Sequence, residues 1–510
     1  MEKIGIIDLG SNSVRLMIVG IAPDGSYKLI DEAKEGVRLS EHMGPEAILK
    51  PIAIERTIEA LRLFQHLCQA HGITRTDCVA TAAVRQAVNQ REFLKQVKAD
   101  TGFDFRVLSG WEEAEAAYNG VINTIDIERG IIVDIGGGST EVIRIEDRRM
   151  VQAISLPFGA VTLTENRIDS ARGANKPGED QLKALENFLS DQFAAIEWIK
   201  DMEAPTIVGL GGTVRNLSKI DRKRKKYSLD ITHNYRMAPK DVHEIYRSVK
   251  TVSLEQRRKI PGLSKDRADI IVAGLAIISA LINAAQGGEL VVSGSGLRDG
   301  LFYQYLLREQ PVPVVDDVVR HCVNNLMRYY SLERDHSRHV AALTLSMFDQ
   351  LKALHEMSPF ERRILEVASL LHDIGIHVNY YDHHKHSFYL ITSTRINGLT
   401  HREILMAAFV AMAHTKTFSG NLLPYKDILS EEDGRTIRKL GVILRIAEAL
   451  ERSEAGVVSE VRLHHHVENV HLIARTRHSA DLEICDAYKV APDFKKVFGR
   501  NLLVSAQSGA

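Results

Sequence analysis

The sequence predicts the α/β fold class, with two α/β domains followed by an all-helical domain and a small α+β extension. Short apolar strands that run into glycine-rich turns recur through residues 1–305. Amphipathic helical patterns lie between these strands, and such alternation is typical of α/β domains. From about Pro311 onward the pattern becomes mostly helical. We therefore expect domains at 1–125, 126–309, 310–457 and 458–510.

The length and composition indicate a large globular protein without an overall excess of either charge. The 510 residues exceed what one hydrophobic core usually serves, and 65 Lys and Arg balance 66 Asp and Glu. This balance gives no sign of nucleic-acid binding, so any anion site is local. The four cysteines lie far apart without a C-x-x-C spacing, which argues against disulfides and structural zinc and favours a reducing cytoplasm.

We expect no segment of the sequence to enter or cross a membrane. Asp8 and Ser11 interrupt the apolar N-terminal run, which argues against a signal peptide. The most apolar stretch, IIVAGLAIISALI from Ile270, is shorter than the roughly 20 residues that span a bilayer. We expect it to form a buried helix.

An internal repeat explains the strands of the first two domains. The stretch GIIDLGSNSVRLMIV at 5–19 is matched in outline by IIVDIGGGSTEVIRI at 131–145. In both, an apolar strand ends in an aspartate, Asp8 or Asp134, turns through glycine and small polar residues, and resumes as a strand. Two weaker copies follow, TIVGLGGTVRNLS at 206–218 and LVVSGSGLRDG at 290–300. Such self-similarity indicates a duplicated domain.

Apolar residues at helical spacing place the helices. In the α/β part they predict helices at 53–71, 111–122, 180–199 and 266–284. In the helical part they predict helices at 315–330, 336–355, 360–374, 400–413 and 435–452. The last segment, VRLHHHVENVHLIARTR, alternates enough to predict strands.

The glycine-rich turns are candidate phosphate sites, because glycine lets backbone N–H groups converge on an anion and Ser, Thr and Asn add donors. One such turn alone is equally an ordinary hairpin, but two aspartate-headed copies favour a binding cleft. We expect phosphate contacts from Gly10, Ser11, Asn12, Ser13, Gly136, Gly137, Gly138, Ser139, Gly211, Gly212 and Thr213. Asp8, Asp134 and Glu141 offer the hard oxygen ligands that Mg²⁺ prefers.

These turns resemble the nucleotide-binding turns of the actin, heat-shock ATPase and sugar-kinase superfamily. Within it, the sequence is most similar to the exopolyphosphatase and guanosine pentaphosphate phosphohydrolase family. The motifs that carry the resemblance are IDLGSNSVRLMI, ATAAVRQAVN, LSGWEEAEAAYNGV, VDIGGGSTEV, GLGGTVRNLS and GSGLRDGLFY, in order over nearly all of 1–305. The resemblance implies two actin-like (ribonuclease H-like) lobes, a Mg²⁺-dependent site in the cleft between them, and a homodimer.

The motif LSGWEEAEAAYNG carries the candidate catalytic acid. Ser109 and Glu112 have the spacing of a helix-capping box, which gives Glu112 a structural role. Glu113 then points elsewhere, and the resemblance implies that it is the general base that activates water. By spacing alone, a solvated acid on a helix surface would be the favoured interpretation of Glu113, and only the resemblance favours the general base.

Three further residues complete the expected site. Arg15 and Arg85 are expected to bind phosphate oxygens, because a guanidinium group forks onto two oxygens and stays charged. Arg85 could instead be an ordinary surface arginine. Glu141 directly follows GGGST, so we assign it to metal binding or to positioning the water, as the resemblance also implies.

Five basic residues in succession, Arg222 to Lys226, have two interpretations. Such a run is usually a solvated loop. Alternatively, it guides a long polyanion toward the site, with an effect that depends on salt.

The helical domain is rich in histidine, with eleven of the 21 histidines between His321 and His414. The motif LLHDIG, which contains His372 and Asp373, together with His336 and the later ILRIAEALERS, resembles the HD superfamily of metal-dependent phosphohydrolases. Glu448 stands where those enzymes have a final aspartate, and its extra methylene moves the ligand oxygens outward. We therefore expect a structural or polyanion-contacting module, with a metal site at His336, His372, Asp373 and Glu448 as the alternative.

The histidines that follow this motif have two interpretations of their own. The basic group His383, His384, Lys385 and His386 either lines a path for polyphosphate or forms a plain surface patch.

Together these features predict a cytoplasmic exopolyphosphatase that removes terminal orthophosphate from inorganic polyphosphate with Mg²⁺, in which Glu113 activates the water. The closest alternative keeps the site and takes guanosine pentaphosphate as substrate. A phosphohydrolase acting through the HD-like residues, or a silent sensor, is a more distant alternative. A kinase is disfavoured because the sequence offers no adenosine-binding motif.

Overall fold

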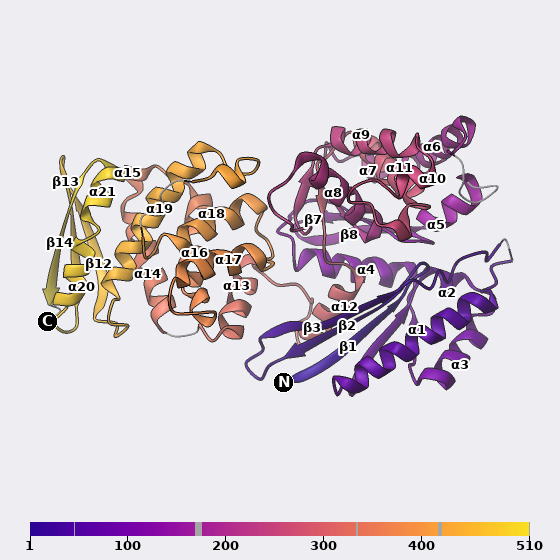
Figure 1. The fold of residues 1–510 in the computed structure, drawn as a ribbon, viewed down its shortest axis with the longest axis horizontal. Coiled ribbons are helices and arrows are strands. Elements are labelled where there is room, and N and C mark those ends of the chain that lie inside the picture. The colour runs from indigo at the N-terminus through magenta and orange to yellow at the C-terminus, as the bar shows by residue number, and fades with distance from the viewer. Residues whose placement is uncertain (45, 169–175, 333–334, 417–420, 509–510) are drawn as a thin grey trace. The chain divides into compact units, whose positions relative to one another are not determined.

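The computed structural model of the protein describes residues 1–44, 46–168, 176–332, 335–416 and 421–508. It divides into two compact units, one of Met1–Tyr227 with Thr232–Val318 and one of Ser228–Ile231 with Val319–Ala510. The first unit holds two α/β lobes, and the second holds a group of helices and a three-stranded sheet (Figure 1). The α/β fold class is confirmed, while the four domain boundaries stay predictions.

The first lobe is built on a five-stranded sheet in the order β3-β2-β1-β4-β5. Its strands are β1 (Glu2–Leu9), β2 (Val14–Ile21), β3 (Tyr27–Glu35), β4 (Arg75–Ala80) and β5 (Arg106–Val107). The first three are antiparallel neighbours, whereas β4 runs parallel to both β1 and β5. Helices α1 (Pro51–Ala70) and α3 (Gln90–Thr101) bury Phe64 and Phe93 in a common core with this sheet.

The second lobe repeats this topology. Its sheet has the order β10-β11-β9-β6-β7-β8, and β6, β7 and β8 are antiparallel neighbours while β6, β9 and β11 are parallel. The strands are β6 (Gly130–Ile135), β7 (Thr140–Glu146), β8 (Arg149–Leu156), β9 (Ile207–Leu210), β10 (Tyr235–Met237) and β11 (Leu290–Val292). The duplicated sequence pattern therefore corresponds to a duplicated strand order.

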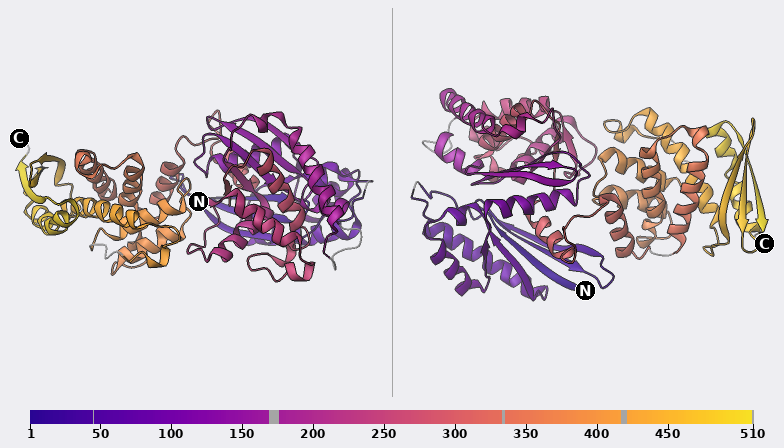
Figure 2. Two further views of the ribbon diagram at one scale, coloured as in Figure 1. Left: turned by 90° about the horizontal axis from the view of Figure 1, so that it is seen from above. Right: turned by 180° about the vertical axis from the view of Figure 1, so that it is seen from behind.

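Two helices, α4 (Gly110–Ile122) and α12 (Leu297–Leu306), lie between the sheets of the two lobes (Figures 1 and 2). Each packs on the sheet of the other half of the chain: α4 joins the core of β6 and β7, and α12 joins the core of β1. Their backbones approach closely, since a Cβ atom at Gly300 would lie 1.8 Å from the carbonyl oxygen of Ala116. Position 300 must be glycine because no side chain fits between the two backbones.

The remaining helices of the first unit follow the predicted pattern in part. The predicted helices appear as α6 (Glu179–Ala194) and the buried α11 (Ile271–Ala284). The two weaker repeats are not hairpins, because β9 runs directly into α8 (Gly211–Lys225) and β11 leads through a short loop to α12. The predicted helix at 180–199 is divided, because α7 (Glu197–Lys200) follows α6 after a short break. Helices α2 (Ala82–Gln86), α3, α5 (Ala160–Leu163), α9 (Pro239–Lys250) and α10 (Leu254–Arg257) were not expected.

The basic run from Arg222 lies at the C-terminal end of α8 and not in a loop. Arg222 is buried, and Lys225 forms ion pairs with Asp221 and Asp241, each at 2.8 Å. The run is therefore helical and not a loop, although its residues from Lys223 to Lys226 are exposed to solvent.

The second unit is mainly helical. It contains α13 (Val318–Tyr329), α14 (Asp335–Gln350), α15 (Lys352–His355), α16 (Pro359–Leu371), α17 (His383–Ser393), α18 (His401–Met412) and α19 (Glu431–Leu450). Helix α18 is buried over eight successive residues from Ile404 to Ala411, as expected for a central helix.

A small sheet follows these helices. Its strands are β12 (Val458–His465), β13 (Asn469–Thr476) and β14 (Asn501–Ser508), with α20 (Asp481–Tyr488) and α21 (Ala491–Phe498) before the last. The strands predicted in the last segment are thus confirmed. Among the described residues, no helix is both long and apolar enough to cross a membrane.

Candidate active site

The two hairpins β1–β2 and β6–β7 end in turns of the same geometry. The N–H of Gly10 donates to the carbonyl of Ser13 at 3.1 Å, and the N–H of Gly136 donates to that of Ser139 at 3.0 Å. The strand-end aspartates face different partners across their hairpins: Asp8 pairs with Arg15, and Asp134 pairs with Glu141.

Both turns open into one pocket in the first unit, and they touch each other. A Cβ atom at Gly138 would lie 2.8 Å from the hydroxyl of Ser11. The start of α8 and the loop before α12 complete the wall, so all four copies of the repeat contribute. The lining comprises Asp8, Gly10, Ser11, Asn12, Ser13, Arg15, Thr81, Glu113, Asp134, Ile135, Gly136, Gly137, Ser139, Gly211, Gly212, Arg215, Arg267, Gly294, Ser295, Gly296, Leu297, Arg298 and Asp299.

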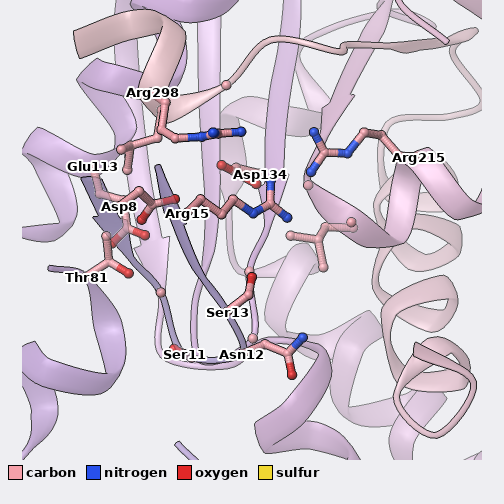
Figure 3. Close-up of a pocket in the computed structure, with 18 of the residues that line it drawn as sticks. Asp8, Ser11, Asn12, Ser13, Arg15, Thr81, Glu113, Asp134, Arg215 and Arg298 are labelled. Carbon is pink, nitrogen blue, oxygen red and sulfur yellow. The ribbon is translucent and has the colours of Figure 1, made fainter. Parts of the chain in front are cut away.

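Four of the described lining residues are arginines, namely Arg15, Arg215, Arg267 and Arg298. In Figure 3, the guanidinium groups of Arg15, Arg215 and Arg298 extend from different elements toward the space around Asp134. Burial, followed by the charge of neighbouring guanidinium groups, lowers the pKa of Arg15, Arg215 and Arg267. Guanidinium groups stay charged even so. Their crowding is relieved when an anion binds among them.

Glu113 lies at the pocket wall and is only 8% exposed. The capping box is confirmed, because Ser109 and Glu112 exchange hydrogen bonds, which leaves Glu113 to face inward. Arg85 donates from Nη1 to Glu113 Oε2 at 2.7 Å and to the carbonyl of Leu108 at 2.8 Å. Burial raises the pKa of Glu113 to about 7, although Arg85 opposes this rise. This carboxyl group can therefore accept a proton near neutral pH.

Three more carboxylates lie beside Glu113, with Glu141 buried and Asp8 and Asp134 half-buried. Burial raises the pKa of Asp134 to about 6 and also raises that of Asp8. Glu141 is 1% exposed and accepts a hydrogen bond from Ser155 Oγ at 2.8 Å. Burial, and then the like charges of Glu113 and Asp134, raise the pKa of Glu141 well above its ordinary value. These oxygens fit a divalent cation such as Mg²⁺, which prefers carboxylate ligands and would offset their repulsion.

Most of the predicted site residues meet at the pocket, but four lie behind its lining. Arg85 holds Glu113, and Glu141 lies against Ser155. The hydroxyl of Thr213 is buried and faces Gly274, and Gly138 packs against Ser11. A direct phosphate contact from the side chain of Arg85 or Thr213 is therefore not supported by the geometry.

Sequence reasoning missed several lining side chains: Thr81, Arg215, Arg267, Ser295, Arg298 and Asp299. Arg215 and Arg298 stand within the two weaker repeats, so an arginine shortly after each glycine turn was an available signal. Arg267 belongs to none of the repeats, and only the fold brings it to Gly212.

The second unit brings the four HD-like residues together. His372 Nε2 lies 3.0 Å and His336 Nε2 lies 3.4 Å from Glu448 Oε2, so the longer glutamate does reach this position. Asp373 Oδ2 lies 3.7 and 3.8 Å from the same two ring nitrogens. His383 also joins this cluster, through Asp373 Oδ1 at 3.5 Å, so this histidine is not part of a plain surface patch.

Comparison with protein families and solved structures agrees with this architecture. A model described as the Ppx/GppA phosphatase family matches residues 18–309, and one described as Ppx/GppA phosphatase, domain III, matches 318–489. The Ppx/GppA family member of Aquifex aeolicus is 30% identical, covers 61% of this chain and 99% of its own, and has a TM-score of 0.52.

A second solved structure shows the fold alone because its sequence identity is lower. This is an exopolyphosphatase from Cytophaga hutchinsonii, 22% identical, which covers 60% of this chain and 98% of its own with a TM-score of 0.55.

Proposed function

Because this chain belongs to the Ppx/GppA phosphatase family, we propose that it is an exopolyphosphatase that releases terminal orthophosphate from inorganic polyphosphate. One observation carries this proposal. A single pocket joins glycine turns and four arginines, which suit phosphate oxygens, with carboxylates, which suit a metal ion and a water. A polyanion and the groups that hydrolyse it can thus be held together.

The lining favours inorganic polyphosphate over guanosine pentaphosphate. Among the described lining residues, only Ile135 and Leu297 have apolar side chains, and none is aromatic. Ligand sites for organic molecules are lined mainly by apolar and aromatic side chains, which a nucleobase would use for stacking. A phosphate chain needs only N–H groups and guanidinium groups. Guanosine pentaphosphate is the alternative substrate, with only its terminal phosphates held here.

The reaction is a hydrolysis in which water attacks the terminal phosphorus atom. Glu113 accepts a proton from that water, and Arg85 holds the Glu113 carboxylate in place. The shortened chain leaves as its oxygen separates from phosphorus, while Arg15, Arg215 and Arg298 stabilise the charge on the phosphate oxygens. Asp134 and Glu141, with Asp8 nearby, would hold Mg²⁺. When bound, this ion would neutralise charge on the phosphate oxygens.

The test is phosphate release from long-chain polyphosphate and from guanosine pentaphosphate, measured in parallel with Mg²⁺ and in its absence. We expect a higher kcat/KM for polyphosphate, and release that depends on Mg²⁺. A higher kcat/KM for guanosine pentaphosphate would make the alternative the main activity. Release from neither substrate would overturn the proposal.

A further inference from the structure

Two interlobe ion pairs connect the lobes next to the pocket, and both lobes belong to the first compact unit. In the first pair, Lys34 Nζ on β3 lies 3.0 Å from Asp266 Oδ2. In the second, Arg38 Nη1, in the segment after β3, lies 2.9 Å from Asp269 Oδ2. Arg38 Nη2 also donates to the carbonyl of Asp266 at 3.5 Å. The pocket residue Arg267 stands between the two aspartates in the sequence, so the first lobe holds its segment on both sides.

The backbone around Arg38 is bound to the first glycine turn of the pocket. The N–H of Arg38 donates to the carbonyl of Asn12 at 3.0 Å, and the N–H of Ser40 donates to that of Ser11 at 3.0 Å. Ser40 Oγ donates to the same carbonyl of Ser11 at 3.3 Å. Ser11 and Asn12 both line the pocket (Figure 3). Arg38 therefore holds a phosphate turn with its backbone and the segment of Arg267 with its side chain.

Inside the pocket, like charges oppose the approach of the two lobes. Arg15 belongs to the first lobe and Arg267 to the second, and both line the pocket. Burial, followed by the charge of Arg15, lowers the pKa of Arg267 to about 10, although Asp266 and Asp269 counteract this fall. Two guanidinium groups repel each other more strongly where little water separates them. The interlobe ion pairs therefore offset a repulsion that the substrate would otherwise have to overcome alone.

Arg38 has a second acidic neighbour in its own lobe. Arg38 Nη1 lies 3.9 Å from Glu41 Oε1, which is farther than the 2.9 Å to Asp269. If the lobes separate, the guanidinium group of Arg38 can still pair with Glu41. The side chains of Arg38 and Asp269 are 39% and 29% exposed, and ion pairs that water reaches contribute little free energy. The connection between the lobes is therefore modest and reversible.

We propose that Arg38 is a positioning residue, which holds Arg267 close enough to the first glycine turn for both to bind the same phosphate chain. It acts through Asp269, and Lys34 assists through Asp266. Without these pairs fewer molecules hold the binding arrangement, and the apparent affinity falls with that fraction. The inference rests on the proposed function, because it assigns further residues to the same pocket. It applies to polyphosphate and to guanosine pentaphosphate alike, because both present terminal phosphates.

Steady-state phosphate release measures this role. Arg38→Gln should raise KM by about 1.5- to 5-fold, the range for one exposed ion pair, and leave kcat largely unchanged. Asp269→Asn should raise KM equally, and the double variant should add little to either single change. A general effect of charge on a polyanion predicts the opposite for Asp269→Asn, because removing an acid near the pocket would lower KM. The matched control is Arg106→Gln, which removes an exposed ion pair with Asp77 inside the first lobe and should leave KM unchanged.

Amide hydrogen exchange of the full-length chain, measured without substrate, gives a readout that does not depend on activity. Arg38→Gln should speed exchange in peptides that cover residues 264–270, because local opening of this segment becomes easier. Arg106→Gln should leave exchange in this segment unchanged. Should Arg38→Gln fail to fold, Asp269→Asn serves for both measurements.

Three results would overturn the inference: unchanged exchange at 264–270 in Arg38→Gln, an unchanged KM in this variant, or a lower KM in Asp269→Asn. Failure of the proposed function looks different, because the wild type would then release phosphate from neither substrate. In that case hydrogen exchange alone still decides whether Arg38 holds the segment of Arg267.

Discussion

The hairpins β1–β2 and β6–β7 have the same backbone design but differ in the side chain that lies opposite the strand-end aspartate. Each strand ends in an aspartate, and each turn closes with the same hydrogen bond from glycine to serine. Opposite the aspartate, however, the first hairpin has Arg15 and the second has Glu141. The difference teaches that the repeated backbone supplies hydrogen-bond donors for phosphate oxygens. The position opposite the aspartate decides whether a hairpin adds a cation or a further carboxylate.

The largest expected effect concerns Glu113, which belongs to neither hairpin. The hairpins are expected to bind phosphate and Mg²⁺, whereas Glu113 accepts the proton. Glu113→Gln should therefore lower kcat by about 10²- to 10⁴-fold with little change in KM. Phosphate release from polyphosphate under saturating Mg²⁺ is the measurement.

Glu112→Gln is the matched control for that variant. Glu112 is the adjacent glutamate, and a glutamine at its position still completes the capping box. We expect near wild-type activity from it. Equal losses in both variants would point to damage to α4, and full activity in Glu113→Gln would show that Glu113 is not the base.

The comparison itself is sharpened by altering the position at which the hairpins differ. Arg15→Gln should raise KM for polyphosphate by about 10- to 100-fold, as expected for losing a charge-assisted hydrogen bond, and leave the Mg²⁺ dependence unchanged. Glu141→Gln should instead raise the Mg²⁺ concentration needed for half-maximal activity. Steady-state titrations of substrate and of Mg²⁺ separate the two effects. The same response in both variants would break the division of roles.

The pH dependence gives a smaller effect. The pKa of Glu113 is raised to about 7, and only its deprotonated form can accept a proton. We expect kcat/KM, which reports the free enzyme, to fall about tenfold per pH unit below that value. Arg85 lowers the pKa of Glu113, so Arg85→Gln should move this fall in kcat/KM to higher pH. Profiles of kcat/KM from pH 5 to 9 check this expectation. If the fall occurs at the same pH in Arg85→Gln and the wild type, a group other than Glu113 causes it.

The smallest effect concerns the space beside α8. A Cβ atom at Gly212 would lie 2.0 Å from Cζ of Arg267, so Gly212→Ala should displace that guanidinium group and raise KM several-fold. Gly36→Ala is the control, because a Cβ atom there meets no atom within 4 Å. Comparable KM values in both variants would show that Arg267 contributes little to substrate binding.

Much of the fold was predictable because its signals are local. The hairpins follow from apolar strands flanking Gly10 and Gly136, and the capping box follows from the spacing of Ser109 and Glu112. The weaker repeats predicted a strand that runs into a glycine-rich turn, and this pattern leaves open whether a strand or a helix follows. Helix α8 begins at Gly211, whose φ of +85° favours glycine, and sequence alone does not distinguish that turn from a hairpin.

The sequence by itself determined the two aspartate-headed turns, the position of Glu113 on its helix, and the acid and histidine residue types available. Only the tertiary structure decided that Arg85 holds Glu113, that Arg267 reaches Gly212, and that His383 and His414 face Asp373. The physical reason is the separation along the chain between the residues that interact. Turns and caps depend on neighbours within a few residues, whereas these contacts join separate elements whose approach is set by the packing of whole helices and sheets.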